Sequence, residues 1–183
     1  MRYDDIREDL DELIVSEEQI LARLDELARE VERDYEGSTP LILGVLKGAV
    51  MVVSDFVRAL RIHADMDWMA VSSYGTGTVS SGVVKILKDL DTDVTGRDVL
   101  IVEDIIDSGL TLAWLRDNLI TRGANSVKIL TALRKPDAVI SDVVPDYLGF
   151  DIPNKFIVGY GCDYAEKYRN LRDVAVLSPK MYS

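Results

Sequence analysis

The stretch from Val99 to Thr111 gathers the side chains best suited to chemistry. It reads Val-Leu-Ile-Val-Glu-Asp-Ile-Ile-Asp-Ser-Gly-Leu-Thr. Its three acidic residues are Glu103, Asp104 and Asp107. Carboxylates bind hard metal ions and accept hydrogen bonds from sugar hydroxyls, but they repel a bare phosphate. The stretch therefore predicts a site for a ligand that brings a cation or hydroxyl groups.

The stretch begins as a predicted strand, and a predicted helix follows its turn residues. The apolar run from Val99 is typical of a strand buried in a parallel sheet. Apolar residues then recur at helical spacing, at Leu112, Leu115, Leu119 and Ile120. A helix that begins after small turn residues leaves backbone N–H groups that favour an anion. The alternative is a structural connection whose acids only cap the helix, although such acids are costly without a ligand.

The whole stretch resembles the motif by which phosphoribosyltransferases bind phosphoribosyl pyrophosphate. The glycines of the dinucleotide motif and the lysine of the P-loop are absent. The resemblance implies that Glu103 and Asp104 hold the ribose hydroxyls, directly or through Mg²⁺. It implies a cradle for the 5′-phosphate made by Asp107, Ser108, Gly109, Leu110 and Thr111. Asp107 is also implied to be catalytic, exchanging a proton with N7 of a purine.

Lys47 and Gly48 follow an apolar segment over 41–45, which predicts a strand. Ligands of open α/β sheets bind at the carboxyl edge of the strands, although a lysine there can also be a solvated turn residue. In the family that the central stretch resembles, this loop contacts pyrophosphate. The resemblance also implies a cis peptide bond between Leu46 and Lys47.

Two further strands are predicted over 68–74 and 83–87. Three glycines and several hydroxylated residues lie in the connection, 75–82, which on its own is an ordinary hairpin loop. Its length resembles the mobile lid of the same family, here about residues 73–85. A lid excludes water during reaction, and the resemblance places Ser73 and Tyr74 at the pyrophosphate.

Lys135 follows a strand predicted over 127–133, so it also lies at the carboxyl edge. Alone it would be a solvated turn residue. In the family a lysine here contacts the exocyclic oxygen of a 6-oxopurine. A lysine donates hydrogen bonds and cannot accept them, so it favours hypoxanthine or guanine over adenine.

The run from Lys155 to Arg169 resembles the hypoxanthine-guanine branch of the family, with the pattern Lys-Phe-Ile-Val-Gly-Tyr-Gly-x-Asp-Tyr-x-Glu-x-Tyr-Arg. The resemblance implies that Phe156 stacks on the purine and that Ile157 offers backbone groups to its edge. Asp163 is implied to lie at the purine site and to reach a second Mg²⁺, and Arg169 to pair with pyrophosphate. Without the resemblance, Phe156 would be assigned to the core.

Composition excludes several classes of function. The chain has 183 residues, 48% of them hydrophobic, which suits one domain. Cys162 and His63 are the only cysteine and histidine, so disulfides, histidine metal sites and histidine-based triads are disfavoured. The net charge of −11 disfavours nucleic acid and anionic membranes as partners. We expect a cytoplasmic protein with neither signal peptide nor membrane span.

The remaining pattern predicts an α/β fold, with a mostly parallel sheet flanked by helices. Residues 1–36 are interpreted as helical, with a capping box at Ser16, and further strands are expected over 147–150, 155–160 and 174–177. The family fold implies one domain. Its core would cover about 37–160, and its small hood would combine the N-terminal segment with about 161–183. Arg172-Asp173 is more polar than the family pattern.

The predicted function is purine salvage, in which phosphoribose passes from phosphoribosyl pyrophosphate to N9 of hypoxanthine or guanine, giving IMP or GMP and pyrophosphate. The cofactor is expected to be Mg²⁺, and the family implies a homodimer or homotetramer. One alternative is a xanthine-preferring relative. The other is a nucleotide-sensing regulator that binds RNA or DNA, which the acidic charge disfavours.

Overall fold

A computed structural model describes residues 1–73 and 84–182. Its main sheet has six strands in the order β4-β3-β2-β5-β6-β7, and all neighbours are parallel except β3 and β4. The strands are β2 (Leu41–Leu46), β3 (Asp65–Ser73), β4 (Val84–Lys88), β5 (Asp98–Ile106), β6 (Ser126–Arg134) and β7 (Tyr147–Asp151). The mostly parallel α/β fold predicted from the sequence is confirmed.

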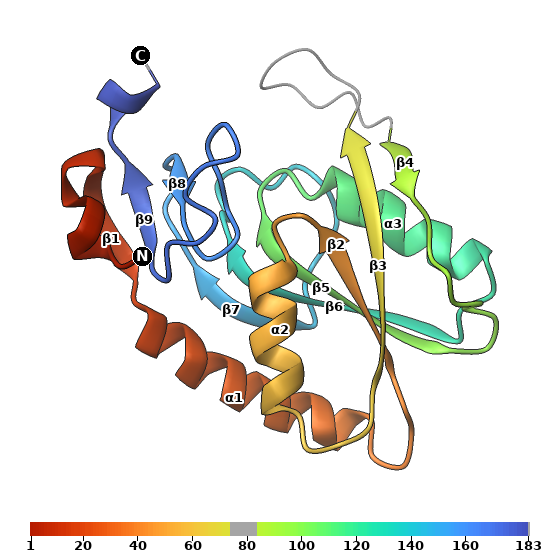
Figure 1. Cartoon of the computed structure of the whole chain (residues 1–183). Coiled ribbons are helices and arrows are strands. Elements are labelled where there is room, and N and C mark those ends of the chain that lie inside the picture. The colour runs from red at the N-terminus through yellow and green to blue at the C-terminus, as the bar shows by residue number, and fades with distance from the viewer. Residues whose placement is uncertain (74–83, 183) are drawn as a thin grey trace.

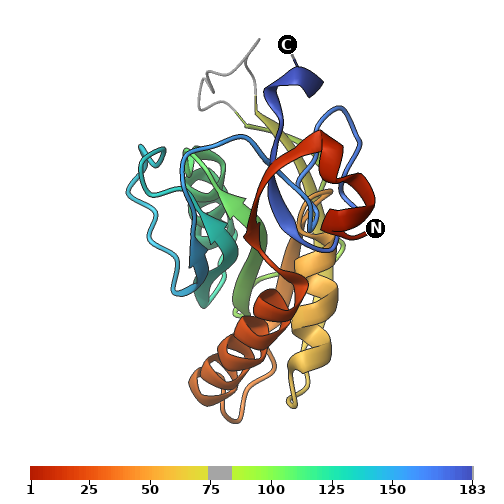
Figure 2. The same cartoon turned by 90° about the vertical axis from the view of Figure 1, so that its left-hand side faces the viewer.

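Helices cover both faces of this sheet (Figures 1 and 2). Helices α1 (Glu17–Asp34) and α2 (Val50–Ala59) pack on one face, in the same apolar cluster as Ile42. Helix α3 (Leu110–Thr121) packs on the other face, in the same cluster as Leu43. Successive strand residues point to opposite faces, so an apolar run along β2 fills both layers of the core.

A second, three-stranded sheet, here the hood sheet, has the order β1-β9-β8. Its strands are β1 (Leu10–Val15), β8 (Ile157–Val158) and β9 (Val174–Leu177). Short 3₁₀ helices flank it at Tyr3–Asp9 and Pro179–Met181. In Figure 1 the hood sheet lies at the upper left, on the side where the parallel strands end. It joins segments from both ends of the described chain.

The prediction of helix over residues 1–36 is wrong for Leu10–Val15, although a 3₁₀ helix precedes that segment. The capping box at Ser16 is confirmed, because the Ser16 hydroxyl accepts from the Gln19 N–H and the Gln19 side chain accepts from the Ser16 N–H. Before it the chain forms β1, which pairs antiparallel with β9. The strand predicted over 155–160 is shorter than expected, since only Ile157 and Val158 pair, with β9.

The hairpin pairing of β3 with β4 is confirmed by the match of Ser73 with Val84. The predicted lid between them, with Tyr74, lies outside the described residues. Within residues 1–73 and 84–182, none of the helices has the length and hydropathy that a bilayer crossing requires.

The polar pair Arg172-Asp173 ties the hood to the start of α1. The Asp173 side chain is buried, and its two oxygens accept from the backbone N–H groups of Tyr3 (2.9 Å) and Glu17 (3.0 Å). Arg172 pairs with the Glu17 carboxylate at 2.7 Å. Asp173 thus satisfies two backbone donors from segments more than 150 residues away, which accounts for a buried charge at this position.

We predict that Asp173→Ala lowers the melting temperature by about 5–10 °C, because it leaves two partly buried N–H groups without an acceptor. Asp173→Asn keeps one side-chain oxygen and should lie between this variant and wild type. The exposed Asp142→Ala is the control. Thermal unfolding followed by circular dichroism measures the difference, and equal melting temperatures for Asp173→Ala and Asp142→Ala would contradict the assignment.

Candidate functional site

A cavity of about 290 Å³ opens at the carboxyl edge of the main sheet. It takes residues from β2, β3, β5, the start of α3 and the hood segment. Its lining residues are Val45, Leu46, Gly48, Val71, Glu103, Asp104, Ile105, Ile106, Asp107, Ser108, Gly109, Thr111, Leu112 and Arg169. Residues singled out in three separate stretches of the sequence therefore line one cavity.

Glu103 and Asp104 bring two carboxyl groups into this cavity without a matching cation. Burial, followed by the nearby Asp104 charge, raises the pKa of Glu103 well above its usual range. Burial also raises the pKa of Asp104, although hydrogen bonds from the Cys162 thiol and the Ile105 N–H oppose the shift. A buried carboxyl pair of this kind favours a ligand that supplies positive charge or donor hydroxyls.

Two buried side-chain atoms in the cavity, Glu103 Oε2 and Arg169 Nε, have no hydrogen-bond partner among residues 1–73 and 84–182. Such atoms are rare in folded proteins, because an unmade buried hydrogen bond is costly. Glu103 Oε2 is a hydrogen-bond acceptor, and Arg169 Nε is a hydrogen-bond donor on a positively charged group. The first suits a cation or a hydroxyl group of a ligand, and the second suits an anion.

The start of α3 lies beside these carboxylates. Gly109 precedes the helix with a φ of 78°, the first turn has no acidic residue, and the Ser108 hydroxyl accepts from the Leu110 N–H at 3.4 Å. A Cβ on Gly109 would lie 2.2 Å from the Ser141 hydroxyl. The Ile140 and Ser141 N–H groups bond to the Ser108 carbonyl, so a neighbouring loop fixes this turn. Backbone N–H groups at the helix start are therefore positioned for a phosphate.

The Lys47-Gly48 loop lies between Asp104, near the carboxyl end of β5, and the hood. The expected cis peptide bond between Leu46 and Lys47 is present. A Cβ on Gly48 would lie 2.0 Å from Asp104 Oδ2, and a Cβ on Gly161 would lie 2.0 Å from the Gly48 carbonyl oxygen. We name Asp104, Gly48 and Gly161 the glycine stack, because three chain segments meet there with no room for a side chain.

The cations near the cavity already have acidic partners. The Arg169 guanidinium lies 2.8 Å from Asp163 and 3.5 Å from Glu166, and it also donates to the Gly161 carbonyl. The Lys47 ammonium lies 3.0 Å from Glu166. The Lys47 hydrogen bond lowers the pKa of Glu166. A polyanion entering here would have to take the place of the Glu166 carboxylate.

Lys135 and Asp107 lie side by side because β5 and β6 are in parallel register. Ile106 is opposite Arg134, and the next residues approach until Lys135 Nζ lies 3.2 Å from Asp107 Oδ2. The Lys135 side chain is only 10% exposed, whereas that of Asp107 is 59% exposed. The lysine is therefore held in place, and the carboxylate is open to a ligand.

Phe156 and Ile157 are in the hood rather than among the lining residues of the cavity. Ile157 is buried and begins β8, where it pairs with Val176. Phe156 precedes it and is 44% exposed. The assignment of Phe156 to the core, which its residue type alone suggests, therefore does not fit this structure.

Sequence reasoning missed three residues that contact the site, namely Glu166, Cys162 and Ser141. Glu166 lies three residues from both Asp163 and Arg169, and this spacing was a usable signal. The Cys162 thiol, whose pKa is raised by burial, donates to Asp104 at 3.5 Å. Nothing in the local sequence around Cys162 or Ser141 indicates these contacts, since both cross between distant segments.

The carboxylates fit a magnesium ion to different degrees. Glu103 and Asp104 present oxygen ligands, one of them without a partner. Both oxygens of Asp163 are engaged, one with Arg169 and one with the Glu166 N–H. In the part of the chain that the structure describes, metal-ligating side chains do not gather in threes. The neighbouring pair Glu103 and Asp104 suits Mg²⁺, which proteins commonly hold through one or two carboxylates together with substrate phosphates.

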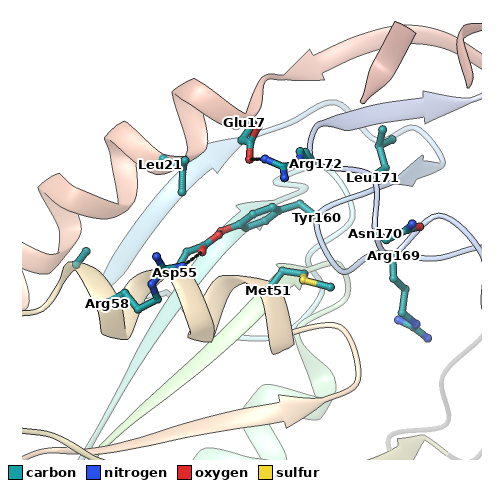
Figure 3. Close-up of a pocket in the computed structure, with 11 residues that line it drawn as sticks. Glu17, Leu21, Met51, Asp55, Arg58, Tyr160, Arg169, Asn170, Leu171 and Arg172 are labelled. Atoms are coloured by element: carbon teal, nitrogen blue, oxygen red, sulfur yellow. Dashed lines mark hydrogen bonds and ion pairs between the residues drawn. The ribbon is translucent and has the colours of Figure 1, made fainter. Parts of the chain in front are cut away.

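A larger cavity of about 620 Å³ lies between α1, α2 and the hood segment 169–172 (Figure 3). Figure 3 shows Tyr160 reaching across it to Asp55, with a hydrogen bond of 2.8 Å. The Glu17 carboxylate there pairs with Arg172. Its carboxylates thus have partners, and of the residues predicted to contact a ligand only Arg169 lines it. The smaller cavity is therefore the candidate site.

Comparison with known proteins identifies the family. A family model described as a phosphoribosyl transferase domain matches residues 13–165. The chain is 52% identical over 180 residues to a hypoxanthine-guanine phosphoribosyltransferase of Mycobacterium bovis, with 95% of this chain and 89% of that protein covered. It is 49% identical over 177 residues to the Bacillus subtilis protein of the same name, covering 97% and 98%.

Solved structures agree with these matches. A hypoxanthine phosphoribosyltransferase from Staphylococcus aureus superposes with a TM-score of 0.95 at 41% identity, covering 98% of this chain and 97% of that one. A hypoxanthine-guanine phosphoribosyltransferase from Bacillus anthracis gives a TM-score of 0.88 at 43% identity, covering 92% and 99%.

We predict that Gly161→Ala destabilises the protein more than Gly96→Ala. Both glycines have positive φ, but a Cβ at Gly96 meets nothing within 4 Å. The shared backbone strain costs about 1 kcal/mol, and the clash with the Gly48 carbonyl adds about 1–3 kcal/mol. Chemical denaturation measures both variants, and equal losses of stability would contradict the close contact in the glycine stack.

We also predict that Glu103→Gln raises the melting temperature by about 3–6 °C in magnesium-free buffer at neutral pH. The change removes a buried carboxyl group that has an unpaired oxygen and an acidic neighbour, and it keeps the shape of the side chain. Glu36→Gln, at an exposed position, is the control. A lower melting temperature for Glu103→Gln than for Glu36→Gln would show that Glu103 is satisfied in the free protein.

Proposed function

The chain belongs to the phosphoribosyltransferase family, and we propose that it transfers phosphoribose from phosphoribosyl pyrophosphate to N9 of hypoxanthine or guanine, yielding IMP or GMP and pyrophosphate. One observation carries the proposal beyond the family. One cavity is lined by Glu103 Oε2, which has no hydrogen-bond partner among the described residues, by the N-terminus of α3 and by the Arg169 guanidinium. That set suits a ligand with hydroxyls, phosphate and pyrophosphate together.

The phosphoribosyl group is assigned to the carboxyl end of β5 and the start of α3. The Ser108 and Thr111 hydroxyls and the backbone N–H groups from Asp107 to Thr111, including those of Gly109 and Leu110, would cradle the 5′-phosphate. Glu103 and Asp104 would accept hydrogen bonds from the ribose hydroxyls. Their burial makes these bonds stronger than in water and fixes the sugar relative to the sheet edge.

Pyrophosphate is assigned to Lys47, the Gly48 backbone and Arg169. Negative charge grows on pyrophosphate as its bond to C1 of the ribose breaks, and positive charge grows in the sugar ring. The two cations would stabilise the departing group in exchange for their contacts with Glu166 and Asp163. Ser73 and Tyr74 are proposed at the same group, from the end of β3 and the lid that would exclude water.

The cofactor is proposed to be Mg²⁺, held by Glu103 and Asp104, with Asp163 at a second ion. When bound, the ion neutralises charge on pyrophosphate and orients the ribose hydroxyls. Asp163 would serve there only after giving up its contact with Arg169 or with the Glu166 N–H.

The purine is assigned to the space between Asp107 and the hood. Lys135 would donate to the exocyclic oxygen, Phe156 would stack on the rings, and Ile157 and Asp163 would lie at the purine edge. Asp107, exposed beside Lys135, would take the N7 proton as the N9–C1 bond forms. The buried lysine offers only donors, which favours 6-oxopurines over adenine.

We further propose that residues 1–183 form one phosphoribosyltransferase domain. Its core is about 37–160, its hood combines the N-terminal segment with about 161–183, and its lid is about 73–85. We place it in the cytoplasm as a homodimer or homotetramer, with neither nucleic acid nor membrane as a partner. The net charge of −11 supports the last point.

The test is nucleotide formation from phosphoribosyl pyrophosphate and Mg²⁺ with hypoxanthine, guanine, xanthine and adenine in separate reactions. We expect turnover of hypoxanthine and guanine, lost when EDTA removes the metal. Asp107→Asn should lower kcat by about 10²–10⁴-fold because it removes the proton acceptor. Asp117→Asn, exposed on α3, is the control.

Three outcomes would contradict the proposal. Turnover of adenine alone would overturn the role of Lys135. Turnover of xanthine in preference to the other bases would favour the xanthine-preferring relative. Failure with every base, by folded protein that binds RNA at physiological salt, would favour the regulator.

A further inference from the structure

Three aromatic rings meet on the hood, and we name Phe156, Tyr164 and Tyr182 the aromatic trio. The Phe156 and Tyr182 ring centroids are 5.1 Å apart with their planes at 39°. The Tyr164 ring meets the edge of Phe156 at 5.8 Å and 84°, and it lies 6.0 Å from Tyr182. These spacings are those of attractive aromatic pairs, so each ring limits the orientation of the other two.

The backbone holds both Phe156 and Tyr182 in place. The Leu177 N–H donates to the Phe156 carbonyl at 3.0 Å, which joins the end of β9 to the residue before β8. The chain then turns through Pro179–Met181, where the Ser178 N–H bonds to Asp9 and the Tyr182 N–H to Pro179. Tyr182 is thus presented to Phe156 by a hydrogen-bonded turn at the end of a sheet strand.

The trio is only partly covered, unlike the core. Phe156 is 44% and Tyr182 is 41% exposed. Burial therefore does not fix the Phe156 ring, which precedes the two-residue strand β8. Among the described residues, the Tyr164 and Tyr182 rings pack against it and limit its rotation. A ring that stacks on a ligand needs such support, because each free rotamer weakens binding.

We propose that Tyr182 is a positioning residue for the purine site, which packs on Phe156 and holds that ring in the plane that receives the base. The inference rests on the proposed function, in which Phe156 stacks on the purine. Tyr182 acts through Phe156 and not on the reacting atoms. Its loss should therefore affect base binding and leave the phosphoribosyl donor unaffected.

The experiment compares the KM values for hypoxanthine and for phosphoribosyl pyrophosphate in wild type, Tyr182→Ala and Tyr182→Phe. We expect Tyr182→Ala to raise the KM for hypoxanthine about 3–10-fold and to leave the KM for the donor within about twofold. Tyr182→Phe keeps the ring and should restore the wild-type value. Calorimetric binding of IMP gives a second readout without turnover, in which Tyr182→Ala should weaken binding by a similar factor.

Two further variants control for general damage. Ile120→Ala removes a side chain that is 53% exposed at the end of α3 and should change neither KM. Tyr182→Leu keeps an apolar side chain without a ring. It should behave as Tyr182→Ala does and serves where the alanine variant folds poorly.

The outcomes separate the two proposals. A wild type that turns over no purine overturns the proposed function and this inference with it. An active wild type overturns the inference alone in any of three cases: Tyr182→Ala leaves the KM for hypoxanthine unchanged or lowers it, it raises both KM values equally, or Tyr182→Phe is as impaired as Tyr182→Ala.

Discussion

The glycine stack of Asp104, Gly48 and Gly161 is the contact on which the site geometry depends. It brings together the carboxyl end of β5, the loop between β2 and α2, and the hood. These segments are distant in the sequence, and each carries different proposed functions. Because backbone meets backbone and carboxylate with no room for a Cβ, the three segments cannot approach one another more closely. The hood is thereby packed directly against the carboxyl edge of the sheet.

In the free protein, the positively charged side chains of the proposed site pair with acidic side chains. The proposed ligands are anionic and the protein carries a net charge of −11, yet the site contains the cations Lys47, Lys135 and Arg169. Each pairs with a carboxylate, namely Glu166, Asp107 or Asp163. The Lys47 pair is exposed and screened by water, so its disruption costs little. A charged substrate can therefore replace Glu166 as the partner of Lys47 at a small energetic cost.

The sequence predicted what local patterns encode. The strand and helix of the central stretch, the Ser16 capping box and the parallel sheet all have short-range signals, and the structure confirms them. The predicted acidic loop differs, because Glu103 and Asp104 lie inside β5 and only Asp107 follows the strand. The hood sheet could not be predicted from local sequence patterns. Strand β1 has a mixed, acidic sequence and is a strand because β9, about 160 residues later, supplies its hydrogen bonds. The role of Asp173 likewise depends on distant segments, because the N–H groups of Tyr3 and Glu17 donate to its side chain.

The sequence also does not show which of the proposed site residues pair with one another. Residue type and motif indicated that Asp163 and Arg169 both serve the ligand, but not that they pair with each other at 2.8 Å. That pairing has a consequence for the proposed chemistry. Arg169 cannot face pyrophosphate fully while it neutralises Asp163, and Asp163 cannot reach a metal ion fully while it holds Arg169. Binding of a metal–pyrophosphate unit would satisfy both residues at once, whereas either component alone would leave one of them unpaired. The arrangement therefore favours joint arrival of cation and pyrophosphate over arrival of either one separately.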